Sequence, residues 1–135
     1  MNDLVSVVIL NYNGMNIIKP CLDSVLAQDY GNLEVIVVDN ASQDGSLDIV
    51  SKNYKNVQVI QNQRNLGFSA GNNIGMKRAK GDFLLILNND AELDTKCITE
   101  LKLSLDKEER YGTSASKIYL KDSPGTIDAA GIIVF

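Results

Sequence analysis

The stretch FLLILNND, residues 83 to 90, decides the fold class that we expect for this chain. Its five apolar residues, Phe83 to Leu87, predict a strand that is buried on both faces. Strands of this kind, apolar throughout rather than alternating, are typical of parallel sheets that carry helices on both sides. The strand stops abruptly at Asn88, Asn89 and Asp90, which indicates either a turn or a binding site.

Three further apolar segments, at residues 4–10, 33–39 and 57–60, precede this strand and alternate with segments of helical periodicity. We expect helices at about 18–26, 46–54, 69–80 and 95–106, and two further strands at 114–120 and 131–135. Alternating strands and helices favour one mainly parallel sheet covered on both faces. The sequence therefore predicts a single α/β domain over residues 1–135, three-layered and Rossmann-like.

The charge balance excludes several classes of function. The chain has 13 basic and 17 acidic residues, a net charge of -4, and no basic run longer than Lys77 and Arg78. Nucleic-acid binding is disfavoured because it relies on clustered cations. The sequence contains no histidine, so mechanisms that need an imidazole and the common zinc sites are also excluded.

Cysteine content and hydropathy bear on the cellular location. Cys21 and Cys97 both lie among apolar residues at helical spacing, which predicts buried, reduced thiols rather than a disulfide. No apolar run approaches the roughly 18 to 20 residues of a membrane span, and the first residues lack a signal-peptide pattern. We therefore expect a soluble, cytoplasmic chain without a membrane span.

Polar residues gather after each of the first four predicted strands. In a parallel sheet these positions share one edge, where ligands of open α/β sheets bind. Turn chemistry alone explains any one cluster, since Asn, Asp and Gly tolerate tight turns. Four clusters after four successive strands favour a binding site. The clusters are Asn11, Tyr12 and Asn13; Asp39, Asn40 and Asp44; Arg64, Asn65 and Gly67; and Asn88, Asn89 and Asp90.

The common nucleotide motifs are missing from these loops. Neither GxxxxGK[ST] nor a GxGxxG after the first strand occurs, which disfavours a P-loop enzyme and a dinucleotide dehydrogenase. A different nucleotide fits the residues that are present. Asp39 could accept a hydrogen bond from a base or ribose, Tyr12 could stack on a base, and Asp90 could hold a hard divalent cation that bridges two phosphates.

Four segments carry a resemblance to a known family: VSVVILNYNG, VIVVDNASQDGS, RNLGFSAGNNIG and LLILNNDAEL. In their order and spacing they resemble the N-terminal, donor-binding part of a family 2 glycosyltransferase of the GT-A fold, close to rhamnosyltransferase-like members. The resemblance covers essentially the whole chain. It implies a nucleotide-diphospho-sugar donor and a role in cell-envelope polysaccharide biosynthesis.

The resemblance also implies roles for individual residues. Asn88 and Asp90 would hold Mn²⁺ or Mg²⁺ in the place of the family's Asp-x-Asp motif. Asn88 departs from that motif because an amide replaces the first carboxylate, so we expect weaker cation binding. The residues implied to bind the donor are Asn11, Tyr12, Asn13, Asp39, Asn65, Gly67, Asn73 and Asn89.

Members of the family that invert the anomeric centre use a carboxylate base to activate an acceptor hydroxyl. None of the late aspartates, Asp94, Asp122 and Asp128, stands in a base motif, and the run GIIVF at 131–135 resembles an interrupted strand. We therefore expect a C-terminally incomplete fragment, with the base and the site for a saccharide or lipid-linked acceptor beyond residue 135. Those parts could also place the protein at the inner face of the membrane.

Two other functions remain open. The chain could be a non-catalytic nucleotide-binding or partner-binding module that keeps the GT-A fold. A nucleotidyltransferase that builds the sugar donor is less favoured, because the segment NYNGMNII lacks the glycine-rich, arginine-containing loop of that class. The sequence defines neither the sugar, the base and the acceptor nor the oligomeric state.

Overall fold

The structure is a computed structural model that describes residues 3–108, 111–123 and 125–130. Strands and helices alternate along most of the chain, as the sequence predicts. The predicted strand at 131–135 lies outside the described residues. The elements are β1 (Val5–Asn11), α1 (Ile18–Leu26), β2 (Leu33–Asp39), α2 (Ser46–Asn53), β3 (Gln58–Gln61), α3 (Phe68–Arg78), β4 (Phe83–Asn88), α4 (Cys97–Leu105), β5 (Ile118–Tyr119) and β6 (Ile127–Ala129).

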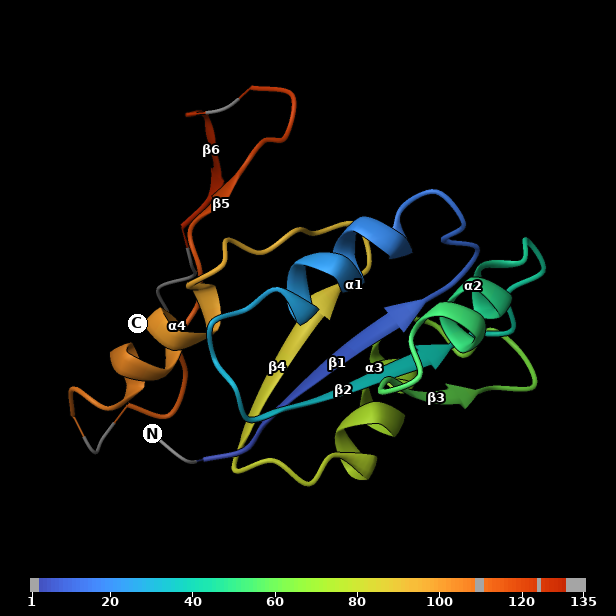
Figure 1. The fold of residues 1–135 in the computed structure, drawn as a ribbon, viewed down its shortest axis with the longest axis horizontal. Coiled ribbons are helices and arrows are strands. Elements are labelled where there is room, and N and C mark those ends of the chain that lie inside the picture. The colour runs from blue at the N-terminus through green and yellow to red at the C-terminus, as the bar shows by residue number, and fades with distance from the viewer. Residues whose placement is uncertain (1–2, 109–110, 124, 131–135) are drawn as a thin grey trace.

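The central sheet has four strands in the order β3-β2-β1-β4, and every neighbouring pair is parallel. Asn11 of β1 is level with Asp39 of β2, which is level with Gln61 of β3. On the other side of β1, Leu10 is level with Asn88. The carboxyl ends of all four strands therefore meet along one edge, where the arrows of Figure 1 end.

Helices cover the two faces of the sheet unequally (Figure 1). The larger core cluster joins one sheet face to α1, α2 and α4 through buried Leu22, Val50 and Ile98. The smaller cluster has Val8, Ile36 and Val38 at its centre, with α3 packed against it. The architecture is thus three-layered, and the expected α/β fold is confirmed.

Strand β4 differs from its prediction. The sequence predicts burial on both faces, but Leu84 and Ile86 are 49% and 39% exposed. The reason lies in the topology, because β4 is an edge strand that pairs with β1 alone. On that face α3 packs against β1 and β2, and no described element covers β4.

The C-terminal part also departs from the expected parallel sheet. Only Ile118 and Tyr119 of the predicted strand at 114–120 are in strand conformation. They pair antiparallel with β6 in a separate two-stranded sheet, which stands apart from the main sheet in Figure 1. Both short strands are exposed throughout. Among the described helices, none has the length and apolar character that crossing a membrane requires.

Helix α3 lies close to the sheet because two glycines face it. A Cβ atom on Gly71 would lie 2.4 Å from Leu10 Cδ1, and one on Gly75 would lie 2.3 Å from Val8 Cγ1. Both distances are well below ordinary van der Waals contact, so larger residues would push the helix outward. The close approach fixes the first turn of α3 beside the ends of β1 and β2.

We predict that Gly75→Ala lowers the free energy of unfolding by about 1 to 3 kcal/mol, because the added methyl group overpacks the contact with Val8. Gly31→Ala is the matched control, since no atom lies within 4 Å of a Cβ built there. Urea denaturation of both variants measures the difference. Equal midpoints for the two variants would contradict the close packing of α3.

Candidate functional site

The side chain of Asn11 is the hub of the carboxyl edge. Asn11 is fully buried at the end of β1, and its amide nitrogen lies 3.0 Å from Asp39 Oδ1 and 2.9 Å from Ser46 Oγ. Its carbonyl oxygen accepts a hydrogen bond of 3.0 Å from the Asn89 amide. One side chain therefore connects the ends of β1, β2 and β4 with the start of α2.

Asp39 is also fully buried, which the sequence did not indicate. Besides the Asn11 amide, its carboxylate accepts bonds from the backbone N–H of Ser42 at 3.0 Å and from the Ser42 hydroxyl at 2.6 Å. Between them, Ala41 adopts a left-handed φ of 62°. In this conformation Asp39 holds the loop after β2 and offers no exposed surface to a ligand.

Asn40 holds the loop after β3 in place through hydrogen bonds of its side chain. It is 1% exposed, and its amide donates to Asn65 Oδ1 and to the carbonyl of Gly67, both at 3.2 Å. Its carbonyl accepts a bond of 2.8 Å from the Asn62 amide. Two of the predicted donor-binding residues, Asn65 and Gly67, are thereby brought to the end of β2.

Asp44 fixes the next part of the loop after β2. Its carboxylate accepts bonds from the backbone N–H groups of Met15, at 2.8 Å, and Ser46, at 3.0 Å. Burial alone would raise the pKa of Asp44, but the hydrogen bonds from Ser46 and Met15 outweigh it and hold the pKa below its usual value. The carboxylate is therefore ionised and tethers the loop after β1 to the start of α2.

The triplet after β4, residues 88–90, contains two exposed side chains and one that is hydrogen-bonded within the protein. Asn88 and Asp90 are exposed, whereas Asn89 is partly buried and bonded to Asn11. Gly14 must be small here, because a Cβ atom would lie 2.2 Å from Asn11 Oδ1 and 2.7 Å from Asn89 Nδ2. The triplet is thus held by Asn89, with Asn88 and Asp90 facing solvent.

The remaining predicted donor-binding residues lie near the surface. Tyr12 is 50% exposed, and Asn13 is exposed with a left-handed φ of 51°. The side-chain carbonyl oxygen of Asn13 accepts a hydrogen bond from the backbone N–H of Gln43, so it holds the loop after β2 in place. Asn73 is exposed on α3, and no described hydrogen bond of its side chain ties it to the other residues of the site.

Sequence reasoning missed Ser42 and Ser46, which bind the Asp39 and Asn11 side chains respectively. The available indication was the spacing, because a serine three residues after a strand-terminal aspartate fits a local side-chain turn. It missed two depressions as well. One, of about 470 Å³, lies among Ala41, Ser42, Gln43, Gln61, Asn62 and Gln63 at the carboxyl edge.

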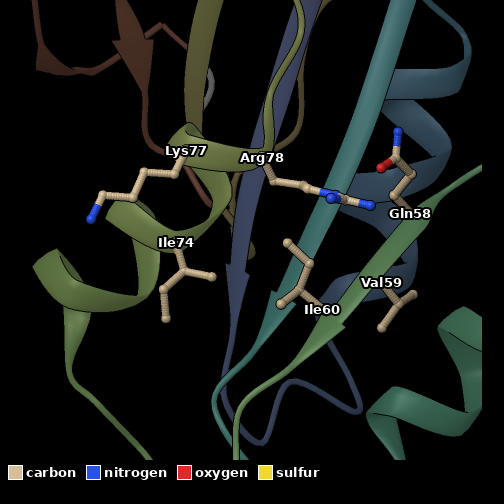
Figure 2. Close-up of a pocket in the computed structure, with 6 residues that line it drawn as sticks. All are labelled: Gln58, Val59, Ile60, Ile74, Lys77 and Arg78. Atoms are coloured by element: carbon tan, nitrogen blue, oxygen red, sulfur yellow. The ribbon is translucent and has the colours of Figure 1, made fainter.

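The other depression, of about 630 Å³, is lined by Gln58, Val59, Ile60, Ile74, Lys77 and Arg78. Figure 2 shows it between β3 and α3, with Arg78 extending toward Gln58 and Lys77 pointing away. It lies along the side of the outer strand, and none of its lining residues belongs to the predicted site. We therefore place the candidate site at the carboxyl edge and not in this depression.

The oxygen atoms after β4 fit a hard divalent cation only in part. Asp90 supplies one carboxylate without a described hydrogen bond, and Asn88 supplies an amide oxygen. Within the described residues, no group of three or more His, Cys, Asp or Glu side chains forms a possible metal site. Magnesium-like ions keep water ligands and take others from substrate phosphates, so this small donor set is compatible with a cation that arrives with a diphosphate.

The fold and its edge define the class of protein, a parallel α/β domain of the GT-A type. Solved neighbours of this domain include a complex with UDP-GlcNAc and one with GDP-Man. The chain belongs to glycosyl transferase family 2, whose family model matches residues 6–129. This confirms the family and fold that the sequence motifs implied.

Three relatives illustrate the similarity. The poly(ribitol-phosphate) beta-glucosyltransferase of Bacillus spizizenii is 38% identical over 103 residues, which cover 70% of this chain and 16% of the relative. The S. aureus TarS structure in complex with UDP has a TM-score of 0.73 at 30% identity, over 78% of this chain and 33% of TarS. The mannosyltransferase PcManGT from Pyrobaculum calidifontis, in complex with GDP-Man and Mn2+, has a TM-score of 0.64 at 28% identity, over 68% of this chain and 29% of PcManGT.

The relatives are much longer than this chain. It spans 15% of the length of one curated relative and 36% of another, and about a third of TarS. The comparisons include glucosyl and mannosyl transferases and a complex with UDP-GlcNAc, and no rhamnosyltransferase is among those described.

We predict that Asn11→Leu lowers the free energy of unfolding by about 3 kcal/mol, because it leaves the buried Asp39 carboxylate without one hydrogen-bond donor. Leucine has nearly the same size, so the effect reports lost hydrogen bonds rather than a cavity. Asn53→Leu, at an exposed position that ends α2, is the control. A chemical denaturation curve for Asn11→Leu that matches that of Asn53→Leu would contradict the hub.

We predict that Cys21 reacts slowly with thiol reagents. Burial, followed by the negative charges of Asp90 and Glu92, raises the pKa of Cys21 to about 12. In a Cys97→Ser variant the labelling rate of the folded protein should still rise about tenfold per pH unit between roughly pH 8 and 10, where an exposed thiol would level off. A plateau near pH 9 would show that Cys21 is accessible.

Proposed function

We propose that this chain is the donor-binding part of an inverting glycosyltransferase that binds a nucleotide-diphospho-sugar with Mn²⁺ or Mg²⁺ and serves transfer to an acceptor hydroxyl. One observation carries the proposal: the loops after all four parallel strands meet at one edge and are joined through the buried side chains of Asn11 and Asn40. Turn residues that served only their own loops would not need these connections. An open edge of this kind is where α/β folds bind nucleotides.

The cation would be held by Asp90, with Asn88 as a second oxygen ligand. It would supply positive charge that stabilises the departing diphosphate. The protein's own residues bind and orient the donor: Tyr12 offers an exposed aromatic face for stacking, and the loop of Asn65 and Gly67 is held in place by Asn40. The buried carboxylate of Asp39 orients the loop after β2 by accepting two hydrogen bonds from Ser42, so in this conformation Asp39 is a positioning residue.

We assign no catalytic base within these 135 residues. The greater length of the relatives supports the proposal that the base and the acceptor site belong to further sequence, which would also bring the saccharide or lipid-linked acceptor and any contact with the membrane. Transfer of rhamnose remains a hypothesis from the sequence motifs. The relatives with stated sugars favour a hexose donor without selecting rhamnose.

The alternative is a non-catalytic module with the same fold. It is supported by Asn88, an amide at the position of the first carboxylate in the Asp-x-Asp motif. An amide binds a divalent cation less strongly than a carboxylate, so a chain that has lost catalysis would tolerate this change. A partner-binding module would bind neither nucleotide nor cation. A non-catalytic nucleotide-binding module would bind the nucleotide and would differ from the enzyme in transferring no sugar.

We predict that UDP or dTDP with Mn²⁺ raises the midpoint of thermal unfolding more than either component alone. A ligand at a hundredfold excess over its Kd adds about 2.7 kcal/mol to the stability of the folded state. The part of the shift that depends on the cation should vanish in Asp90→Ala and increase in Asn88→Asp, which restores a second carboxylate. Asp94→Ala is a control outside the triplet. An unchanged midpoint with millimolar nucleotide and cation would refute donor binding and favour the partner-binding module.

A further inference from the structure

The outer strand β3 has one edge that pairs with no other strand in the described part of the chain, since it stands last in the order β3-β2-β1-β4. Just after β3, the backbone N–H of Asn62 donates to the carbonyl of Asp39 in β2 at 2.8 Å. Backbone groups of successive strand residues point to alternate sides, so those of Ile60 also face β2 and those of Val59 and Gln61 face away. An edge of this kind can pair with another extended segment.

The larger depression, of about 630 Å³, lies directly beside this edge, between β3 and α3 (Figure 2). Ile60 and Ile74 give it an apolar lining, whereas Gln58, Lys77 and Arg78 are polar or charged. A segment added to β3 would place every second side chain on the side of α3. A side chain level with Ile60 would then meet the apolar lining, and one two residues along would lie level with Gln58, toward which Arg78 extends.

The depression carries positive charge that the protein does not neutralise. Lys77 and Arg78 are the only adjacent basic pair in the sequence, and both are exposed. Within the described residues neither forms an ion pair. The carboxylate of Glu34 accepts a hydrogen bond of 2.8 Å from Gln58 and does not pair with Arg78. In a chain of net charge -4, this surface is therefore complementary to a partner that carries carboxylates.

A second copy of this chain does not fit the edge. Antiparallel pairing of two β3 strands about a two-fold axis would place both α3 helices on the same face of the joined sheet. Lys77 and Arg78 of the two copies would then lie near one another, and like charges repel. A small anion would use the cations but leave the backbone groups of Val59 and Gln61 unpaired. An extended acidic segment of another protein uses both features.

We propose that the outer edge of β3 and the depression beside it bind an extended, acidic segment of a partner protein, which adds a fifth strand to the four-stranded sheet. An apolar side chain of the segment covers Ile60 and Ile74, and an acidic side chain two residues away lies beside Arg78. The depression shares no lining residue with the predicted donor site, so the proposal does not depend on donor binding. The partner is held at the side of the domain, and the carboxyl edge stays open.

The test is an NMR titration of the isotope-labelled chain with the peptide acetyl-Thr-Glu-Thr-Val-Thr-Glu-Thr-amide. Its symmetric pattern presents an acid two residues from the valine for either strand direction. The amide resonances of Val59 and Gln61 should shift, and Lys77→Glu/Arg78→Glu should weaken binding at least about tenfold.

The matched control variant is Lys96→Glu/Lys107→Glu, which makes the same change of charge at exposed positions on either side of α4. Helix α4 packs on the opposite face of the sheet, so this variant should bind the peptide within about twofold of the wild type. A peptide with lysine in place of glutamate should bind at least about tenfold more weakly. Equal binding of the two peptides would contradict the role of charge.

Strand addition is tested separately with two peptides, N-methylated at the central valine or at the threonine that follows it. Only alternate N–H groups of an added strand point toward β3, so one methylated peptide should bind at least about tenfold more weakly and the other as the parent does. Equal affinities of the two would exclude strand addition. No shift with millimolar parent peptide would refute the proposal. Dimerisation of the free chain that shifts the Val59 and Gln61 resonances would assign the edge to a second copy instead.

Discussion

The hydrogen bond between the buried Asn11 amide and the Asp39 carboxylate, 3.0 Å long, is the contact on which the carboxyl edge depends. A buried carboxylate is costly unless hydrogen bonds satisfy it, and Asn11 and Ser42 supply them. The same Asn11 side chain binds Asn89 through its carbonyl oxygen. Removing the Asn11 side chain therefore affects three strand ends at once, although the apolar core beneath them would remain packed.

This arrangement divides the polar residues of the edge into two groups. Asn11, Asp39 and Asn40 are buried and bind other protein groups, so they determine where the loops lie. The groups that a ligand can reach are exposed, among them Tyr12 and Asp90. A ligand would meet loops that are already ordered, which favours affinity because less conformational entropy is lost on binding.

The sequence predicted the parallel sheet and its layers well, because apolar runs and helical periodicity reflect burial directly. It erred where burial depends on position in the sheet. Leu84 and Ile86 look like core residues but lie on an edge strand, where neighbours cover one side only. The antiparallel pair of β5 and β6 was also missed, because strands this short carry too little periodicity.

For the site, the sequence predicted that the strand-end residues lie at one edge, as they do in the structure. It could not distinguish the residues that hold the loops from those that a ligand can reach. Asp39 stands out in a motif because a charged residue ends an apolar strand. In the structure, however, its carboxylate accepts hydrogen bonds from Asn11 and Ser42 within the protein. Gln61 and Gln63 belong to no motif, yet they line an open depression. The buried motif residues Asn11, Asp39 and Asn40 therefore form the scaffold of this site, and the exposed residues beside them are where ligand specificity should be sought.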